Sequence, residues 1–274
     1  MIEMAVVLVI FGLLMSFFMG ASSVFLSNKS REMTRSSIQA VDAALALFVS
    51  TNGRLPCPAD GTIATGAAGA GVSLPAAAGE CTLNQNDGVV PWVTLGIPEV
   101  EAEDGWNTRL TYRVFSAANG LTIANGMNMS SCDPAGRGTV AVPTTQACDS
   151  NCTSGDLETC TPPALFVANK GLRIEDVAGN ILMDPASNTG AAYVIISHGS
   201  DGGGGYSNQG VVSAGNGTAA GTREALNVNN RDVQATYIDN EVNHGVSVSH
   251  FDDLVSRPSI SSVAYRAYLA PRNH

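Results

Sequence analysis

The side chains best suited to bond-breaking chemistry occur together at one place in the sequence. His198 follows Ser197 and precedes Ser200 and Asp201 by a few residues. A nucleophile, a base and an orienting carboxylate could be drawn from such a set. However, the GxSxG turn that presents a nucleophilic serine is absent from the sequence. A histidine at a strand end is more commonly a hydrogen-bonding residue than a catalytic base, so we predict that the chain is not an enzyme.

Cysteines are the second group with distinctive chemistry. The six are Cys57, Cys81, Cys132, Cys148, Cys152 and Cys160. An even number of cysteines in a region rich in Gly, Ser, Thr and Asn is typical of disulfides formed in an oxidising compartment. Zinc is the alternative for the last three, but their spacing lacks a second CxxC or a pair of histidines. We predict disulfides, with the pairing left open, in a domain outside the cytoplasm.

Glu3 is the third candidate, because it lies at the start of a long uncharged segment. Residues 4–26 contain no charged side chain, and at a helical rise of about 1.5 Å per residue they would cover roughly 34 Å, enough for a bilayer core. A removable signal peptide is the alternative, but its apolar core is shorter and its front is basic. An unpaired carboxylate near hydrocarbon costs on the order of 3 kcal/mol. Glu3 is therefore expected either to stay hydrated at the interface or to pair with a cation, at the start of a transmembrane helix over 1–27.

The same helix is expected to continue beyond the membrane. Apolar side chains recur mostly three or four residues apart, at Met33, Ile38, Val41, Leu45 and Phe48. This spacing places them on one face of a helix, and Gly53 stands where helices commonly end. We therefore predict an amphipathic half over 28–53, which completes an N-terminal helix over 1–53 and packs on a head made by 54–274.

The head is predicted to be rich in β-structure. Apolar positions alternate near 110–114, and a short β-branched run lies within 191–199. Trp92 and Trp106 are expected to anchor its core. The stretch 116–165 is rich in Asn, Gly, Ser, Thr and Pro and carries four of the six cysteines, which favours a disulfide-pinned insertion. The predicted fold class is α+β, with a long N-terminal helix packed on a β-sheet-rich head.

The charge balance excludes one class of partner. The chain has 14 basic and 24 acidic residues, a net charge of −10, and the excess of acid lies after residue 54. A phosphate backbone is held mainly by Lys and Arg, so no nucleic-acid partner is predicted. The apolar share of 45% also excludes a disordered chain.

The segment IEMAVVLVIFGLL at 2–14 resembles the N-terminal segment of type IV pilins and type II secretion pseudopilins, and DGWNTRLTYRV at 104–114 is similar to a pattern in pseudopilin heads. The resemblance implies that Glu3 is the family glutamate, which pairs with the N-terminal amine of an adjacent subunit, and that Gly12 is the helix glycine. It also implies like subunits, an inner-membrane assembly platform and a prepilin peptidase as partners. The head would lie in the periplasm before assembly, and in a pseudopilus or cell-surface filament afterwards.

A second part of the resemblance concerns calcium. YVIISHGSDGGGG at 193–205 and FDDLVSR at 251–257 resemble the end of the major pseudopilin head, which encloses a calcium ion. The ligands that the resemblance implies are Ser197, Asp201, Asp252 and Asp253. Calcium binds carboxylate and carbonyl oxygens, and glycines let the chain fold tightly around the ion. The alternative is that the Gly-rich segment forms a turn that binds no ion.

Two functions from different classes stay open. The first is a structural subunit of a type IV pilus-like filament or a type II secretion pseudopilus, assembling through its hydrophobic helix. The second is a membrane-tethered periplasmic domain with a binding or hydrolytic role. The two differ at Glu3, because a plain anchor should tolerate glutamine there whereas an assembling subunit should not.

Overall fold

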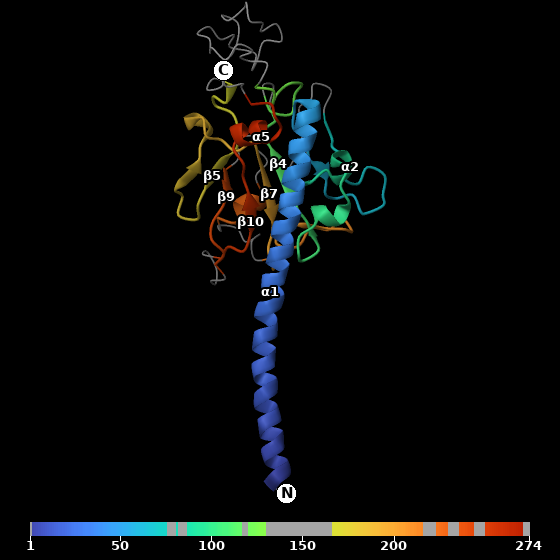
Figure 1. Ribbon diagram of the computed structural model, residues 1–274, viewed down its shortest axis with the longest axis vertical. Helices are drawn as coiled ribbons and strands as arrows, with labels where there is room; N and C mark the ends of the chain where they lie inside the picture. The colour runs from blue at the N-terminus through green and yellow to red at the C-terminus, as the bar shows by residue number, and fades with distance from the viewer. Residues whose placement is uncertain are drawn as a thin grey trace, which may run out of the picture.

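The computed structural model of the chain combines one long N-terminal helix with a head of mostly antiparallel sheets and short helices (Figure 1). It describes residues 2–75, 81, 87–116, 120–129, 166–215, 223–229, 236–243 and 250–270. Within the first 24 residues, side chains are described only at Met4, Val7, Ile10 and Phe11. The predicted α+β class is confirmed at this level.

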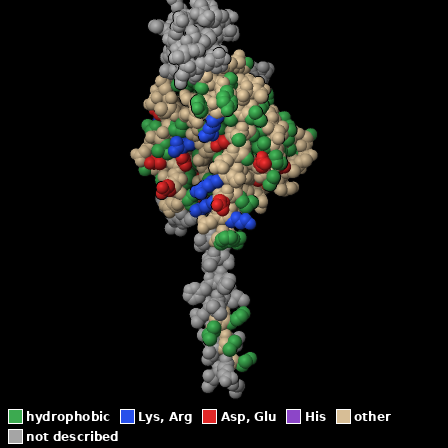
Figure 2. Space-filling model, in the orientation of Figure 1, with side chains coloured by type: hydrophobic (Ala, Val, Ile, Leu, Met, Phe, Trp, Pro, Cys, Tyr) green, Lys and Arg blue, Asp and Glu red, His purple; other side chains and the backbone are tan. Residues whose placement is uncertain are grey.

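The long helix, α1, spans Ile2–Asn52 and ends where Gly53 adopts a left-handed φ of 64°. The first half of α1 extends away from the head, and the second half lies against it (Figure 1). Because no other described element flanks the first half, the apolar side chains described there are exposed. These are Met4, Val7, Ile10, Phe11, Phe25 and Leu26, some of which are visible in Figure 2.

The second half of α1 buries one apolar stripe in the head. The stripe consists of Ile38, Val41, Leu45 and Val49. The prediction was wrong for Met33, which is exposed, and Phe48 is only half-buried. The stripe continues instead through Thr34 at one end and Val49 at the other. The Thr34 hydroxyl donates to the Ser30 carbonyl at 2.9 Å and accepts the Gly105 amide at 2.9 Å. A small polar residue therefore allows the head backbone to approach the helix closely at this point.

The central sheet has five antiparallel strands in the order β1-β2-β4-β7-β10. The strands are β1 Ala59–Asp60, β2 Gly88–Val89, β4 Thr111–Val114, β7 Tyr193–Ser197 and β10 Leu254–Ser256. Every residue of β4 and β7 is buried, and α1 shares its core with these two strands. The strand patterns expected near 110–114 and within 191–199 correspond to β4 and β7.

Smaller elements surround this sheet. Two further sheets are present, one with the order β6-β5-β9 and one pairing β3 with β8. Their strands are β3 Thr108–Arg109, β5 Arg173–Glu175, β6 Ile181–Met183, β8 Tyr206–Ser207 and β9 Thr236–Ile238. The short helices are α2 Trp92–Leu95, η2 Glu99–Ala102, η3 Pro185–Ser187, α4 Ala225–Asn229 and α5 Ile260–Arg266.

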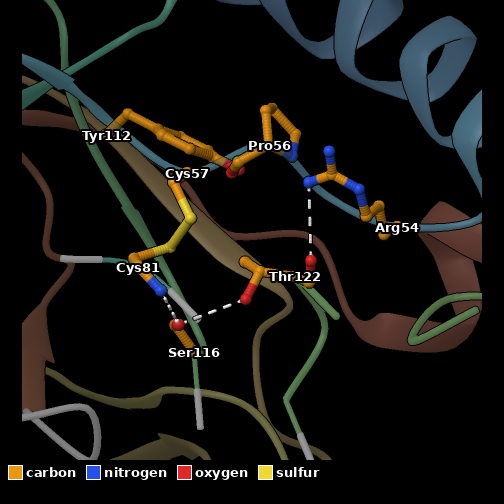
Figure 3. Close-up of a disulfide and its surroundings, with 7 residues drawn as sticks. All are labelled: Arg54, Pro56, Cys57, Cys81, Tyr112, Ser116 and Thr122. Atoms are coloured by element: carbon orange, nitrogen blue, oxygen red, sulfur yellow. Dashed lines mark hydrogen bonds between the residues drawn. A yellow bond between two sulfur atoms is a disulfide. The ribbon is translucent and has the colours of Figure 1, made fainter. Parts of the chain in front are cut away.

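A disulfide joins Cys57, just after α1, to Cys81 (Figure 3). The Cys81 amide donates to the Ser116 hydroxyl at 2.7 Å, so the bridge also ties this segment to the end of β4. The predicted disulfide cysteines Cys132, Cys148, Cys152 and Cys160 lie outside the described residues, as does most of the predicted insertion at 116–165.

A polar contact fixes α1 to the central sheet. The Asp42 carboxylate accepts the Tyr193 hydroxyl at 2.8 Å and the Ser256 hydroxyl at 3.0 Å. Asp42→Ala would leave the buried Tyr193 hydroxyl without this acceptor, and we expect it to lower the free energy of unfolding by about 1–3 kcal/mol. Asp42→Asn keeps an oxygen for Tyr193 and should lose less. Urea unfolding measures both, and equal losses would contradict the hydrogen-bond explanation.

The same residue gives a pH dependence. Burial raises the pKa of the Asp42 carboxyl above its usual value, although the hydrogen bonds from Tyr193 and Ser256 act in the opposite direction. A carboxyl with a raised pKa binds more protons in the folded state, so its contribution to stability is complete below the unfolded pKa and is lost as the pH rises through the folded pKa. The free energy of unfolding of Asp42→Asn should lack this pH-dependent part. Unfolding is measured at pH values from below the unfolded pKa of Asp42 to above its folded pKa.

Candidate metal site in the head

The pairing of β7 with β10 brings acidic residues together at one edge of the central sheet. The two strands are antiparallel, with Ser197 opposite Leu254. The segment that leaves β7 therefore lies beside the segment that enters β10. The first segment contains Asp201, and the second contains Asp252 and Asp253. The antiparallel register thus joins residues that are about fifty positions apart in the sequence.

Asp252 is fixed by the turn that follows β7. One of its oxygens, Oδ2, accepts the Ser200 amide at 2.7 Å, the Ser200 hydroxyl at 2.9 Å and the Asp201 amide at 3.1 Å. This turn requires Gly199, whose φ is 62° and where a Cβ atom would lie 2.4 Å from the Asp252 carbonyl oxygen. The glycine therefore permits the close approach that positions the carboxylate.

A third segment adds Glu224, which precedes α4. The Glu224 Oε1 atom accepts the Asp252 amide at 2.8 Å. Nearby, the Asn227 side chain donates to Asp253 Oδ2 at 2.6 Å and to the Ile238 carbonyl at 3.0 Å. Asn227 thus joins α4 to β9 and to the acidic cluster. We define the acidic cluster as Asp201, Glu224, Asp252 and Asp253.

Two oxygens of this cluster lack a hydrogen-bond donor among the described residues. Among the described residues, Glu224 Oε2 and Asp252 Oδ1 are buried and have no hydrogen-bond partner. Oxygens of Glu224, Asp252 and Asp253 lie within 4.8 Å of one another. In a second group, one atom from each of Asp201, Asp252 and His250 also lies within 4.8 Å of the others. Buried acceptors without donors are costly, so this geometry suits a bound cation.

The proton affinities of the carboxyls reflect the same crowding. Burial raises the pKa of Asp253 well above its usual value, and the neighbouring Glu224 charge raises it further. Burial, opposed by the hydrogen bond from the Asp252 amide, raises the pKa of Glu224 to about 7. A divalent cation among these oxygens would act in the opposite direction and favour the ionised forms.

Of the four ligands expected from the sequence, Asp252 lies near both Asp201 and Asp253, and Ser197 has another role. Asp201 and Asp253 belong to two different groups of possible ligand atoms, which share Asp252. Ser197 lies at the end of β7, but its hydroxyl donates to Asp104 Oδ2 at 2.7 Å. Its proton is therefore used to satisfy a buried carboxylate. Carboxylate oxygens are ligands that divalent cations such as calcium accept. Glu224, rather than Ser197, supplies the further oxygen atoms near Asp252 and Asp253.

Two residues of the site were missed by the sequence analysis. Glu224 has no local motif, and only the position of α4 brings it to the cluster. His250 comes two residues before Asp252, so its proximity was visible in the sequence. In the structure its Nε2 atom lies 3.4 Å from Asp201 Oδ2, 3.5 Å from Asp252 Oδ1 and 4.0 Å from Glu224 Oε2.

The arrangement around His198 differs from a serine and histidine pair. His198 is buried, and its Nε2 atom lies 2.8 Å from the Thr111 hydroxyl. Burial, reinforced by the Arg113 charge, lowers the pKa of His198 to about 4, so the ring is neutral at pH 7. The hydroxyls of Ser197 and Ser200 donate instead to Asp104 and Asp252.

The residues expected to act in assembly lie in α1. Glu3 and Gly12 are both within Ile2–Asn52, and the Glu3 side chain is outside the described residues. Within the part of the chain that the structure describes, no helix contains an apolar stretch long enough to cross a membrane. Comparison of the chain with protein-family models, curated proteins and solved structures finds no match.

Proposed function

We propose that the chain is a structural subunit of a filament related to type IV pili or type II secretion pseudopili, and that it assembles through α1. The observation that supports this most is the first half of α1, which extends beyond the head (Figure 1). Its described apolar side chains, such as Met4, Ile10 and Phe11, are exposed. Large exposed apolar surfaces are rare on proteins that act as free monomers. Lipid or the helices of neighbouring subunits would cover this surface.

The exposed side of the second half of α1 offers a further packing surface. A groove of about 480 Å³ runs between this side of α1 and the residues at and just after α5. Exposed Leu47 contributes to it from α1, and Arg266 and Tyr268 contribute from the C-terminal region. Because the head is firmly attached to α1 through its buried stripe, a neighbour packed along α1 would also fix the position of the head.

The proposed cellular route follows from this role. Residues 4–26, which carry no charge, would hold the subunit in the inner membrane with the head in the periplasm. A prepilin peptidase and an inner-membrane assembly platform would then act on it, and like subunits would surround α1 in a pseudopilus or cell-surface filament. The Cys57–Cys81 disulfide is compatible with an oxidising compartment.

The head is proposed to hold a divalent cation at the acidic cluster. Asp201, Glu224, Asp252 and Asp253 would supply carboxylate oxygens, and the cation would neutralise charges that three separate segments bring together. It would thereby fix the segment after β7, the start of β10 and the start of α4 to one another. Calcium is the cation that the sequence resemblance implies for this place.

The test of the filament proposal is the substitution Glu3→Gln. If Glu3 pairs with the N-terminal amine of an adjacent subunit, removing its charge leaves that amine unpaired near hydrocarbon. We expect incorporation into filaments to fall by more than about tenfold, since such a loss is worth several kcal/mol. The amount of subunit in the membrane fraction should not change. Sheared filaments and membranes are quantified by immunoblotting.

Glu32→Gln is the matched control, because Glu32 belongs to the same helix but is exposed beyond the uncharged segment. It should assemble like the unmodified chain. Equal incorporation of the Glu3→Gln and Glu32→Gln chains would contradict the proposal and favour a tethered periplasmic domain, in which α1 serves only as an anchor.

A further inference from the structure

We infer that His250 is a ligand of the proposed cation site and that the site therefore prefers zinc to calcium. This inference rests on the cation site proposed above, and it concerns the identity of the cation. The ligands would be the imidazole Nε2 of His250 and one oxygen each from Asp201, Glu224 and Asp252. It departs from the sequence expectation of an all-oxygen calcium site.

The distances around His250 fit such a set. Its Nε2 atom lies 3.4, 3.5 and 4.0 Å from oxygens of Asp201, Asp252 and Glu224. Ligands at about 2.0 to 2.1 Å from a tetrahedral metal are about 3.4 Å from one another. One atom from each of His250, Asp201 and Asp252 already lies within 4.8 Å of the other two. Rotation of the Glu224 side chain would bring its oxygen toward the same ion. A zinc ion binds both imidazole nitrogens and carboxylate oxygens.

The oxygens that would bind the metal are those left without donors. Asp252 Oδ1 and Glu224 Oε2 are buried and have no hydrogen-bond partner within the described residues. The other oxygen of each carboxylate is held by hydrogen bonds, from Ser200 and Asp201 to Asp252 and from the Asp252 amide to Glu224. Such outer hydrogen bonds orient ligands toward a metal.

The donor set disagrees with calcium. Calcium takes about six to eight oxygen ligands and is not bound by imidazole. Imidazole favours zinc, copper, iron and nickel over calcium. The remaining member of the cluster, Asp253, is held by Asn227 at 2.6 Å and would supply charge behind the ligands.

The side of the site formed by His250 and Asp201 is the more accessible one. The side chains of His250 and Asp201 are 13% and 16% exposed, whereas those of Glu224 and Asp252 are both 2% exposed. The ion would thus meet His250 and Asp201 first and the two buried carboxylates last. An entry path of this kind is a requirement for a metal site in a folded domain.

The experiment uses the full chain in detergent after removal of metal with a chelator. Calorimetric titration with zinc chloride is expected to give one site per chain, with calcium chloride binding at least about tenfold more weakly. Zinc should also raise the thermal unfolding temperature, because a ligand that binds only the folded state stabilises it. Cobalt chloride should produce visible absorption bands of a nitrogen and oxygen site, which report the coordination independently of affinity.

His250→Gln replaces the imidazole by an amide oxygen. It should lower zinc affinity by at least about 10- to 100-fold and abolish the cobalt bands, while the affinity for calcium stays equal or rises. His274→Gln is the control, because it removes a histidine that the inference does not involve. Far-UV circular dichroism without metal establishes that both variants are folded.

The possible outcomes distinguish the preference for zinc from the existence of the cation site. Calcium binding at least as tight as zinc, or zinc binding that is unchanged in His250→Gln, would overturn the inference and leave the cation site standing. Failure of both zinc and calcium to bind would overturn the inference together with the cation site. Neither result bears on filament assembly, which the Glu3→Gln experiment decides separately.

Discussion

Replacing Arg109 with alanine is expected to lower the free energy of unfolding by about 3–5 kcal/mol, because it would break a buried ion pair from one side. The Arg109 side chain is completely buried, and its Nη2 atom lies 2.7 Å from Glu99 Oε1. Its Nε atom donates to the same oxygen at 2.9 Å. Without the guanidinium, the partly buried Glu99 carboxylate would lose its positive partner and keep only the hydrogen bond from the Thr65 hydroxyl.

Arg109 also connects parts of the head that have little secondary structure of their own. Its Nη1 atom donates to the Ile63 carbonyl at 2.7 Å and to the Gly61 carbonyl at 3.2 Å. Its Nη2 atom donates to the Asn208 carbonyl at 3.3 Å, and the guanidinium carbon lies 4.8 Å from the centre of the Trp92 ring. The loop after β1, the turn after β8 and α2 thus depend on one side chain.

Arg109→Lys distinguishes the effect of the positive charge from the effect of the guanidinium hydrogen bonds. Lysine keeps the positive charge but cannot reproduce the fork of donors, so an intermediate loss of stability is expected. Arg35→Ala, on an exposed part of α1, should change stability by less than about 0.5 kcal/mol. Chemical unfolding followed by circular dichroism measures all three variants, and a loss below about 1 kcal/mol for Arg109→Ala would contradict this role.

Removing the Cys57–Cys81 disulfide is expected to lower the free energy of unfolding by about 3 kcal/mol. The bridge closes a loop with a sequence separation of 24 residues. In the chain-entropy account, a loop of that length restricts the unfolded chain by about this amount. The double substitution Cys57→Ala with Cys81→Ala leaves no unpaired thiol at the site. Its chemical unfolding under non-reducing conditions gives the measurement.

The two single variants provide the control. Each breaks the same bond, so Cys57→Ala and Cys81→Ala should each cost about as much as the double variant, and their effects should not add. The surroundings explain why the bridge matters locally, since Ser116 accepts both the Cys81 amide and the Thr122 hydroxyl (Figure 3). A double variant as stable as the unmodified chain would contradict the expected stabilisation.

The α+β class was predictable because its signals are local. Helical periodicity is a property of consecutive residues, and Ile38, Val41 and Leu45 were correctly placed on the buried face of α1. Met33 was misplaced because it lies five positions before Ile38, about 140° around a helix with 3.6 residues per turn. Thr34, four positions before Ile38, is on the buried face instead and contacts Gly105, which is about seventy residues away in the sequence.

The candidate site was predictable only in part. Asp201, Asp252 and Asp253 lie in two segments whose sequences could be compared with a known pattern, and the pairing of β7 with β10 brings these segments together. Glu224 and His250 were not predicted as ligands. Asp104, which accepts the Ser197 hydroxyl, likewise comes from a part of the chain that no local pattern connects with β7.

The sequence by itself determined the long N-terminal helix and the β-rich head, because the period of apolar residues and the turn-forming residues act over short stretches of chain. Only the tertiary structure decided which carboxylates meet, which oxygens lack donors and that an imidazole lies among them. These features depend on the register of β7 with β10 and on the position of α4. Such long-range packing sets the burial and charge of each side chain, and therefore its chemistry, whereas the residue type sets only what that chemistry could be.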